Sequence, residues 1–318
     1  MKKIVVLLGP TGTGKTEITV LLNQKLPLEV ISADSRQVYR YLSIGTNKPQ
    51  GKWEKINNEK LFIYNNTIHY LVDFLEPTLY YDAGSFYEDA KKIIEKIFLK
   101  NKIPIIAGGT GLYIKTITDG ISDLPKRKTE IREHLIQLKN LHGSRYLYDL
   151  LLKLDPIRAE EIHPNNITRI IRSLEVIFQT GKPFSEVIKE NKKNPMYDSL
   201  ILGIIYSKEN LKKRIYERTE WMFRNGLIEE TLYVLNKYKN ENIPAFTSIG
   251  YKWIIKFIKN EIDLETTKKK FIFDTLNYIK RQLTWFRKNT RIKWIYCDNL
   301  DKEKIVENIY TEIVKFLN

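Results

Sequence analysis

Residues 7 to 18 read LLGPTGTGKTEI, and this glycine-rich stretch constrains the fold more than any other part of the chain. Gly9, Gly14, Lys15 and Thr16 fit the pattern G-x-x-x-x-G-K-[ST] of a phosphate-binding loop between a strand and a helix. The preceding KIVVLLG is typical of a buried parallel strand, and the following TEITVLLNQKL is typical of a helix. The context predicts a polyphosphate site but does not say which molecule carries the phosphates.

Further apolar, β-branched segments predict more strands of the same kind. They are LEVISAD at 28–34, KIPIIAGG at 102–109, LILGIIYS at 200–207 and RIKWIYC at 291–297. Between these segments lie stretches whose apolar residues recur at helical spacing, such as EDAKKIIEKIFLK at 88–100. The alternation predicts an α/β fold, with a P-loop NTPase-like parallel sheet core flanked by helices.

The pattern changes between residues 122 and 198. EIREHLIQLKNLH and NITRIIRSLEVIFQTG are amphipathic and helical, and no buried strand is expected before Leu200. We therefore predict an inserted all-helical domain over 122–198. The catalytic core then consists of 1–121 and 199–318.

The composition bears on the binding partners and on the cellular compartment of the protein. The 53 Lys and Arg residues against 38 Asp and Glu give a net charge of +15, which suits an acidic partner such as nucleic acid. A lysine-rich coding bias that merely solvates the surface explains the charge equally well. The single cysteine, Cys297, cannot form an internal disulfide, and no Cys/His cluster has zinc-site spacing. We see no export signal or transmembrane segment and expect a cytoplasmic protein.

The residues directly after two predicted strands are candidates for the site, because ligands of open parallel sheets bind at the carboxyl ends of the strands. Asp34 follows the second strand and could bind a metal or accept a proton. It could also simply cap a turn. Thr110 follows Gly108 and Gly109, and it fits either a ligand contact or a helix cap. No acidic residue stands there, as a P-loop kinase or ATPase would usually require.

Taken together, these segments resemble the tRNA dimethylallyltransferase family, also called tRNA isopentenyltransferases. The matching blocks run in family order along nearly the whole chain: GPTGTGKT at 9–16, SADSRQVYRYLSIGTNKP at 32–49, AGGTGLY at 107–113, HPNNITRIIRSLEV at 163–176, RIYERTEWM at 214–222, SIGYK at 248–252 and KRQLTWFR at 280–287. No C-terminal zinc-finger extension is seen, so we expect a bacterial-type member.

The resemblance implies transfer of a dimethylallyl group from dimethylallyl diphosphate to N6 of the adenosine just 3′ of the anticodon. It also implies that the glycine-rich loop holds the diphosphate. The implied diphosphate-binding residues are Gly9, Pro10, Thr11, Gly12, Thr13, Gly14, Lys15 and Thr16.

The resemblance also assigns roles in the reaction. Asp34 is similar to the family's general base, and Thr110 and Arg218 to the pair that contacts the bridging oxygen of the leaving group. Thr16 would ligate Mg²⁺. Without the resemblance, Arg218 in RIYER reads as a solvated charge on a basic helix.

The implied partner is the anticodon stem-loop of a tRNA, whose target base must be flipped out or unpaired. The implied tRNA-binding residues are Asp34, Ser35, Arg36, Gln37, Thr110, Arg132, Thr168, Arg169, Ile170, Ile171, Arg172, Thr247, Ser248, Ile249, Gly250, Tyr251 and Lys252. Tyr278, Trp285 and Phe286 could stack on bases, although their near-helical spacing favours a place in the core.

Two other functions remain open at this point. One is a prenyltransferase that acts on free adenine nucleotides, against which the helical insertion and the basic tail argue. The other is a P-loop ATPase or kinase that binds nucleic acid. We expect a monomer in each case.

Overall fold

The structure is a computed structural model, and it describes residues 1–191 and 194–318. It contains two compact units: Met1–Thr118 with Met196–Asn318, and Asp119–Pro195. The boundaries lie close to those expected from the sequence. We call the first unit the core unit and the second the helical unit.

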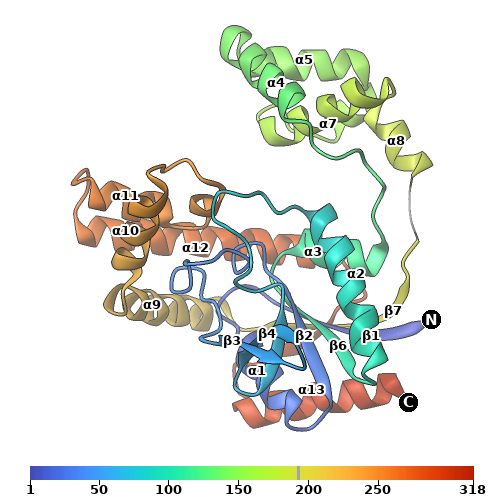
Figure 1. The fold of residues 1–318 in the computed structure, drawn as a ribbon, viewed down its shortest axis with the longest axis vertical. Coiled ribbons are helices and arrows are strands. Elements are labelled where there is room, and N and C mark those ends of the chain that lie inside the picture. Colours follow the sequence, from blue (N-terminus) through green and yellow to red (C-terminus); the bar gives the residue numbers. More distant parts are fainter. Residues whose placement is uncertain (192–193) are drawn as a thin grey trace. The chain divides into compact units, whose positions relative to one another are not determined.

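One eight-stranded sheet spans the described part of the core unit, in the order β3-β4-β5-β2-β6-β1-β7-β8 (Figure 1). From β5 to β8 all neighbouring strands are parallel, whereas β3, β4 and β5 pair antiparallel. The strands are β1 (Lys2–Leu8), β2 (Leu28–Ala33), β3 (Lys52–Ile56), β4 (Glu59–Tyr64), β5 (Thr67–Tyr70), β6 (Ile103–Gly108), β7 (Tyr197–Ile205) and β8 (Lys293–Tyr296).

The central strands form where the sequence predicts them, because their residues are apolar on both faces. Val5 of β1 pairs with Ile105 of β6 and with Leu200 of β7, and all three are buried. β7 begins at Tyr197, earlier than the expected Leu200, since Tyr197 and Asp198 pair with the start of β1. The expectation of no strand before Leu200 is therefore wrong by these residues.

The β3–β4–β5 meander lies outside the predicted strands. Its strands are short and partly exposed, and no residue of β3 is fully buried, so their hydrophobic signal is weak. A local signal does exist, however. The turns contain Asn57-Asn58 and Asn65-Asn66, all four with positive φ between 45° and 64°, and such Asn pairs favour tight hairpin turns.

Helices cover the sheet and extend beyond it. Val5 and Leu7 of β1 share a core with Ile18 of α1 and Ile309 of α13, and α2 packs against β2 and β6. A second core joins α9, α10, α11 and α12 to the segment around Val38. The helices are α1 (Lys15–Asn23), α2 (Ala83–Leu99), α3 (Gly111–Asp119), α9 (Lys208–Arg224), α10 (Leu227–Tyr238), the 3₁₀ helix η1 (Pro244–Thr247), α11 (Tyr251–Ile258), α12 (Leu264–Phe286) and α13 (Lys302–Leu317).

The helical unit has its own hydrophobic core, built around Leu147, Ile170 and Leu174. Asn166 caps the start of α7 by accepting from the Arg169 amide, and Gly181 ends it with φ of 70°. The elements are α4 (Thr129–His142), α5 (Ser144–Leu154), α6 (Pro156–Glu160), α7 (Ile167–Thr180) and α8 (Phe184–Glu190). Across the described residues of both units, no helix is long and apolar enough to cross a membrane.

Because the central strands are buried, truncation of one of their apolar side chains should lower the stability of the protein strongly. Leu202 of β7 is 0% exposed and Leu232 of α10 is 41% exposed. Leu202→Ala should lower the free energy of unfolding by about 2–5 kcal/mol, because it leaves a cavity. Leu232→Ala is the matched control and should change it by about 0.5 kcal/mol or less. Urea denaturation measures both, and equal losses would contradict the assignment of the core.

Candidate active site

The phosphate-binding loop follows β1 directly and leads into α1. Gly12 and Gly14 have φ of 88° and 79°, a conformation that strongly favours glycine. The Lys15 ammonium lies over the loop, with Nζ donating to the carbonyl oxygens of Gly9 at 3.0 Å and Pro10 at 2.9 Å. The loop therefore has the shape that cradles phosphate oxygens, with a cation at its mouth.

A cleft of about 490 Å³ opens beside this loop in the core unit. It lies at the carboxyl ends of β1, β2 and β6, where ligands of parallel sheets bind. Among the residues that line it are Thr11, Gly12, Gly14, Lys15, Thr16, Ser32, Asp34, Gln37, Gly108, Gly109, Arg214, Arg218, Trp221 and Gln282.

Two buried cations dominate the charge of the cleft. Burial lowers the pKa of Lys15 to about 8 and that of Arg218 to about 10, although Asp34 partly offsets both shifts. Arg218 Nη1 donates to Thr11 Oγ1 at 2.8 Å, while its buried Nε has no partner among the described residues. Arg218 is thus a cleft residue and not the solvated charge that its helix alone suggests. Poorly solvated cations at this place favour an anionic ligand.

Asp34 stands directly after β2, where it caps a turn and also lines the cleft. Its Oδ1 accepts from the backbone amides of Arg36 at 2.9 Å and Gln37 at 3.4 Å, so it caps the turn that follows the strand. The carboxylate also lines the cleft. It is fixed in place by the turn and lies in the field of Lys15 and Arg218.

Thr110 connects the ends of β6 and β2. Its Oγ1 accepts from the Ser35 amide at 3.0 Å and donates to Ser35 Oγ at 3.3 Å, and its own amide donates to the Ala33 carbonyl at 3.0 Å. These bonds hold the turn formed by residues 108–110, which we call the GGT turn, against the turn that carries Asp34. Thr110 is therefore hydrogen-bonded to the turn that carries Asp34, and of the two residues only Asp34 is among the described residues that line the cleft.

Sequence reasoning missed Gln282 and Arg214. Gln282 Oε1 accepts from the Thr11 amide at 3.0 Å, and its Nε2 donates to the Gly109 carbonyl at 2.8 Å. A Cβ on Gly109 would lie 2.3 Å from that Nε2, so a larger residue there would displace the Gln282 amide from this position. Arg214 Nε donates to the Gly12 carbonyl at 2.7 Å. Both residues lie within quoted blocks, KRQLTWFR and RIYERTEWM, but nothing in their helical pattern marks them as contacts of the loop.

The structure joins two of the expected tRNA-binding segments of the core unit. Arg36 Nη1 donates to Thr247 Oγ1 at 2.7 Å, and Gln37 lines the cleft. Lys252 is exposed and pairs with Asp274 at 2.9 Å. Other side chains in this set, Ser248 and Tyr251, are buried at 5% and 0% exposure, so neither is directed at a solvent-borne partner.

The expected tRNA-binding residues of the helical unit also differ in solvent exposure. Thr168 and Arg169 are exposed on α7, but Ile170 and Ile171 lie in the core of the unit. Arg172 donates to the Pro125 carbonyl at 2.7 Å and to Glu175 at 3.1 Å, so it stabilises the unit internally. Arg132 is partly buried on α4. Of this set, Thr168 and Arg169 are the most accessible to RNA.

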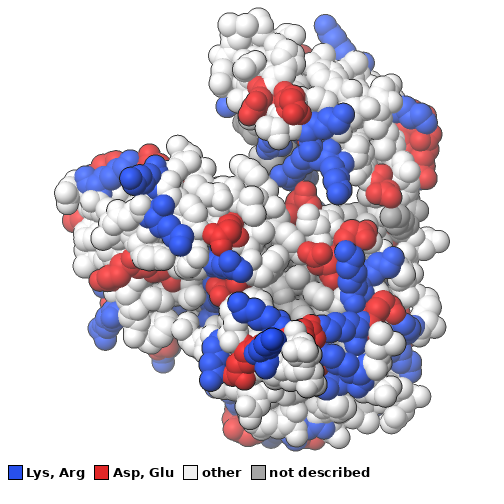
Figure 2. Space-filling model, viewed as in Figure 1, with Lys and Arg blue, Asp and Glu red and all other residues white. Residues whose placement is uncertain are grey.

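The surface charge and the aromatic residues of α12 can also be compared with the predictions from the sequence. Figure 2 shows Lys and Arg mixed with Asp and Glu over the face in view, so the charge is not gathered into one patch there. On α12, Phe286 is 2% exposed, as a core residue should be, whereas Trp285 is 39% exposed. The prediction that Trp285 lies in the core is wrong.

A family model described as "IPP transferase" matches residues 37–289 of the chain. The chain belongs to the IPP transferase family. A tRNA dimethylallyltransferase of Alkaliphilus metalliredigens is 36% identical over 323 residues, covering 100% of this chain and 99% of the relative. The chain is an enzyme of this family, and the resemblance read from its blocks is confirmed.

Solved structures agree with this membership. The tRNA delta(2)-isopentenylpyrophosphate transferase of Staphylococcus epidermidis is 32% identical with a TM-score of 0.68, and the match covers 99% of this chain and 100% of that one. A eukaryotic dimethylallyltransferase acting on tRNA is 26% identical with a TM-score of 0.77, over 94% of this chain and 75% of that one. The predicted P-loop α/β fold is thereby confirmed.

Gln282 should matter for anion binding, because it holds the loop amide of Thr11 and the Gly109 carbonyl together. Gln282→Ala should weaken binding of inorganic diphosphate about fivefold to tenfold, in line with roughly 1 kcal/mol for a lost hydrogen bond. Thr284→Ala, at an exposed position of the same helix, is the control and should bind normally. Titration calorimetry gives both dissociation constants, and normal binding by Gln282→Ala would refute the bridging role.

Proposed function

We propose that this cleft transfers a dimethylallyl group from dimethylallyl diphosphate to N6 of the adenosine 3′-adjacent to the anticodon of tRNAs. The chain is a tRNA dimethylallyltransferase, as are the relatives to which it is similar. The observation that carries the assignment of residues is the convergence of Lys15, Arg218 and Asp34 on one cleft. It combines anion-binding groups with a carboxylate that can accept a proton.

The reaction is a displacement at the allylic carbon of the donor. The adenine N6 forms a bond to this carbon while the bond from carbon to the bridging oxygen breaks, and diphosphate leaves with the bonding electrons. Negative charge therefore grows on the leaving group, where Lys15, Arg218 and the loop amides stabilise it. Asp34 accepts the proton that N6 loses.

Thr110 and Arg218 are proposed to contact the bridging oxygen. Arg218 lines the cleft, its Nε has no hydrogen-bond partner among the described residues, and a guanidinium stays charged when a leaving group approaches. Thr110 supplies a hydroxyl beside the turn of Asp34. Its bonds to Ser35 fix its position, so little reorganisation is needed during the reaction.

The donor set of this loop fits Mg²⁺ bound jointly with the substrate. Thr16 lines the cleft, and among the described residues no group of three His, Cys, Asp or Glu could hold a metal by itself. Mg²⁺ commonly takes few protein ligands and completes its shell with phosphate oxygens and water. We propose that Thr16 Oγ1 is such a ligand, and the ion would neutralise charge on the departing diphosphate.

For the tRNA, the proposal uses expected residues that are exposed, together with Arg36, which is partly exposed. Arg36, Thr247 and Lys252 belong to the core unit, and Thr168 and Arg169 to the helical unit. An extended substrate suits an enzyme that offers basic residues on both units, whereas a free nucleotide needs no such surface. We propose a cytoplasmic monomer as the working form.

Removing the proposed base should stop the chemistry and spare RNA binding. Asp34→Asn keeps the size and the turn acceptor of the side chain but cannot take up the proton. We expect kcat to fall about 10²- to 10⁴-fold, the usual contribution of a general base. The measurement is transfer of labelled dimethylallyl diphosphate, with Mg²⁺, to unmodified anticodon stem-loop RNA, and gel-shift titration should show RNA affinity within about threefold of wild type.

Asp198→Asn provides the matched control, since Asp198 is exposed near the start of β7, away from the carboxyl ends. It should transfer at the wild-type rate. Label on AMP but not on RNA in the wild type would move the substrate to free nucleotides. Full activity of Asp34→Asn would remove Asp34 from the role of base.

The lowered pKa of Lys15 predicts a pH dependence of diphosphate binding. The anion favours the protonated ammonium and raises its pKa, so affinity is complete below the pKa of about 8 and declines as pH rises above it. Between about pH 7 and about pH 9 the dissociation constant of inorganic diphosphate should rise roughly tenfold. Lys15→Arg keeps its charge over this range. Its profile should be flat, and a flat wild-type profile would contradict the prediction.

A further inference from the structure

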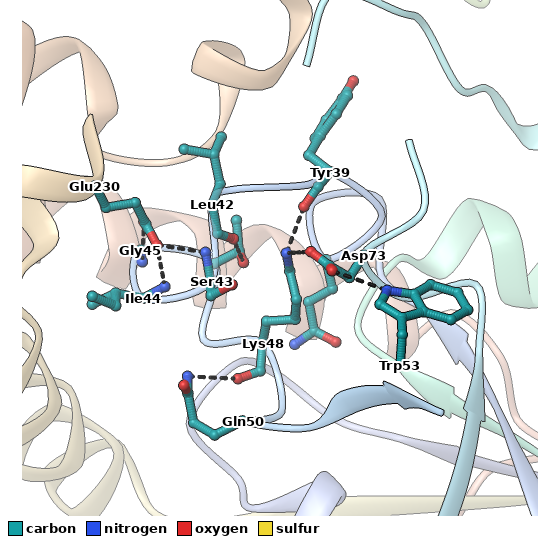
Figure 3. Close-up of polar contacts among 12 residues, drawn as sticks. Tyr39, Leu42, Ser43, Ile44, Gly45, Lys48, Gln50, Trp53, Asp73 and Glu230 are labelled. Atoms are coloured by element: carbon teal, nitrogen blue, oxygen red, sulfur yellow. Dashed lines mark hydrogen bonds and ion pairs between the residues drawn. The ribbon is translucent and has the colours of Figure 1, made fainter. Parts of the chain in front are cut away.

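The carboxylate of Glu230, on α10, collects four hydrogen bonds from two distant segments (Figure 3). Its Oε2 accepts from the amides of Ser43 at 2.5 Å and Ile44 at 2.7 Å, and its Oε1 accepts from the Gly45 amide at 3.1 Å and from Tyr251 Oη at 2.7 Å. Three consecutive amides on one carboxylate form a strong, charge-assisted anchor. We call residues 43–50 the wall loop.

A second anchor holds the other end of the wall loop. The Lys48 side chain is 1% exposed, and its Nζ donates to Asp73 Oδ1 and to the Tyr39 carbonyl, both at 2.5 Å. Trp53 Nε1 donates to the other oxygen of Asp73 at 3.2 Å, as Figure 3 also shows. The loop is therefore tied at both ends by ionised groups.

Three residues of the wall loop line the cleft beside the phosphate-binding loop. Thr46 and Asn47 lie between the two anchors, and Pro49 directly follows Lys48. Asn47 has φ of 50°, a conformation that costs a non-glycine residue energy and persists only where the surroundings fix it. Gln37 Nε2 donates to the Asn47 carbonyl at 2.9 Å, which connects the wall loop to the turn of Asp34.

We propose that Glu230 is a positioning residue for the prenyl donor, which it serves by fixing the wall loop as the surface against which the dimethylallyl group packs. The inference rests on the proposed function. The cations that suit the diphosphate come from the phosphate-binding loop and α9, whereas the wall loop brings no charged side chain to the cleft. The hydroxyl of Thr46 is already bonded to the Leu42 carbonyl, and Pro49 is apolar, which suits contact with a five-carbon hydrocarbon. Glu230 is not among the described residues that line the cleft, so it acts through the loop.

Glu230→Gln tests this role, since it keeps the size of the side chain and removes the charge that the three amides share. We expect the KM for dimethylallyl diphosphate to rise at least about tenfold, because an NH2 donor replaces one of the two oxygens that accept from the loop amides and Tyr251. The dissociation constant of inorganic diphosphate should stay within about twofold, because the phosphate-binding loop is untouched. Glu229→Gln, its exposed neighbour on α10, should match wild type in both measurements.

The outcomes separate the inference from the proposed function. Transfer by wild type with an unchanged donor KM in Glu230→Gln would overturn the inference, as would equal weakening of donor and inorganic diphosphate. No transfer by wild type would instead sink the proposed function. If Glu230→Gln does not fold, as judged by circular dichroism, Glu230→Asp retains the charge at a shorter reach and should raise the donor KM by a smaller factor, about threefold. An unchanged donor KM in Glu230→Asp would then overturn the inference.

Discussion

The parallel pairing of β1, β2 and β6 is the constraint on which the site depends. Because these strands run in the same direction and lie side by side, their carboxyl ends meet at one edge. The sheet therefore makes neighbours of the glycine-rich loop, the Asp34 turn and the GGT turn. Contacts among these three segments are not needed to bring them together. Hydrogen bonds such as that from the Ser35 amide to Thr110 refine an arrangement that the sheet has already made.

The cleft then concentrates positive charge in a place with little water. Lys15 and Arg218 both lose solvation there, and Asp34 compensates them in part. Gathering these charges costs folding energy, which an anionic ligand would return on binding. Under the proposed mechanism, the same cations would stabilise the diphosphate more as it separates from carbon than while it is still esterified, and this difference would accelerate the reaction.

The sequence could predict whatever depends on neighbours along the chain. Asp34 and Thr110 come at or just after strand ends, and Lys15 belongs to a recognisable loop motif after a strand, so their place at the edge of the sheet was foreseeable. Arg218 and Gln282 reach the cleft from α9 and α12, whose approach is set by tertiary packing, and a polar residue on such a helix looks the same whether it faces water or a ligand. Tyr251 is the opposite case. It belongs to the segment SIGYK, which resembles the family's tRNA-binding segment, but its side chain is buried and bonded to Glu230.

The order of the strands also leaves β3 and β8 at the two ends of the sheet, each with one side unpaired by its neighbours. Unpaired strand edges invite other chains to add to them. β3 reads KWEKI and β8 is only four residues long, KWIY. Repeated charge on one edge strand and the short length of the other discourage such addition, so the edges of the sheet carry their own protection against association with other chains.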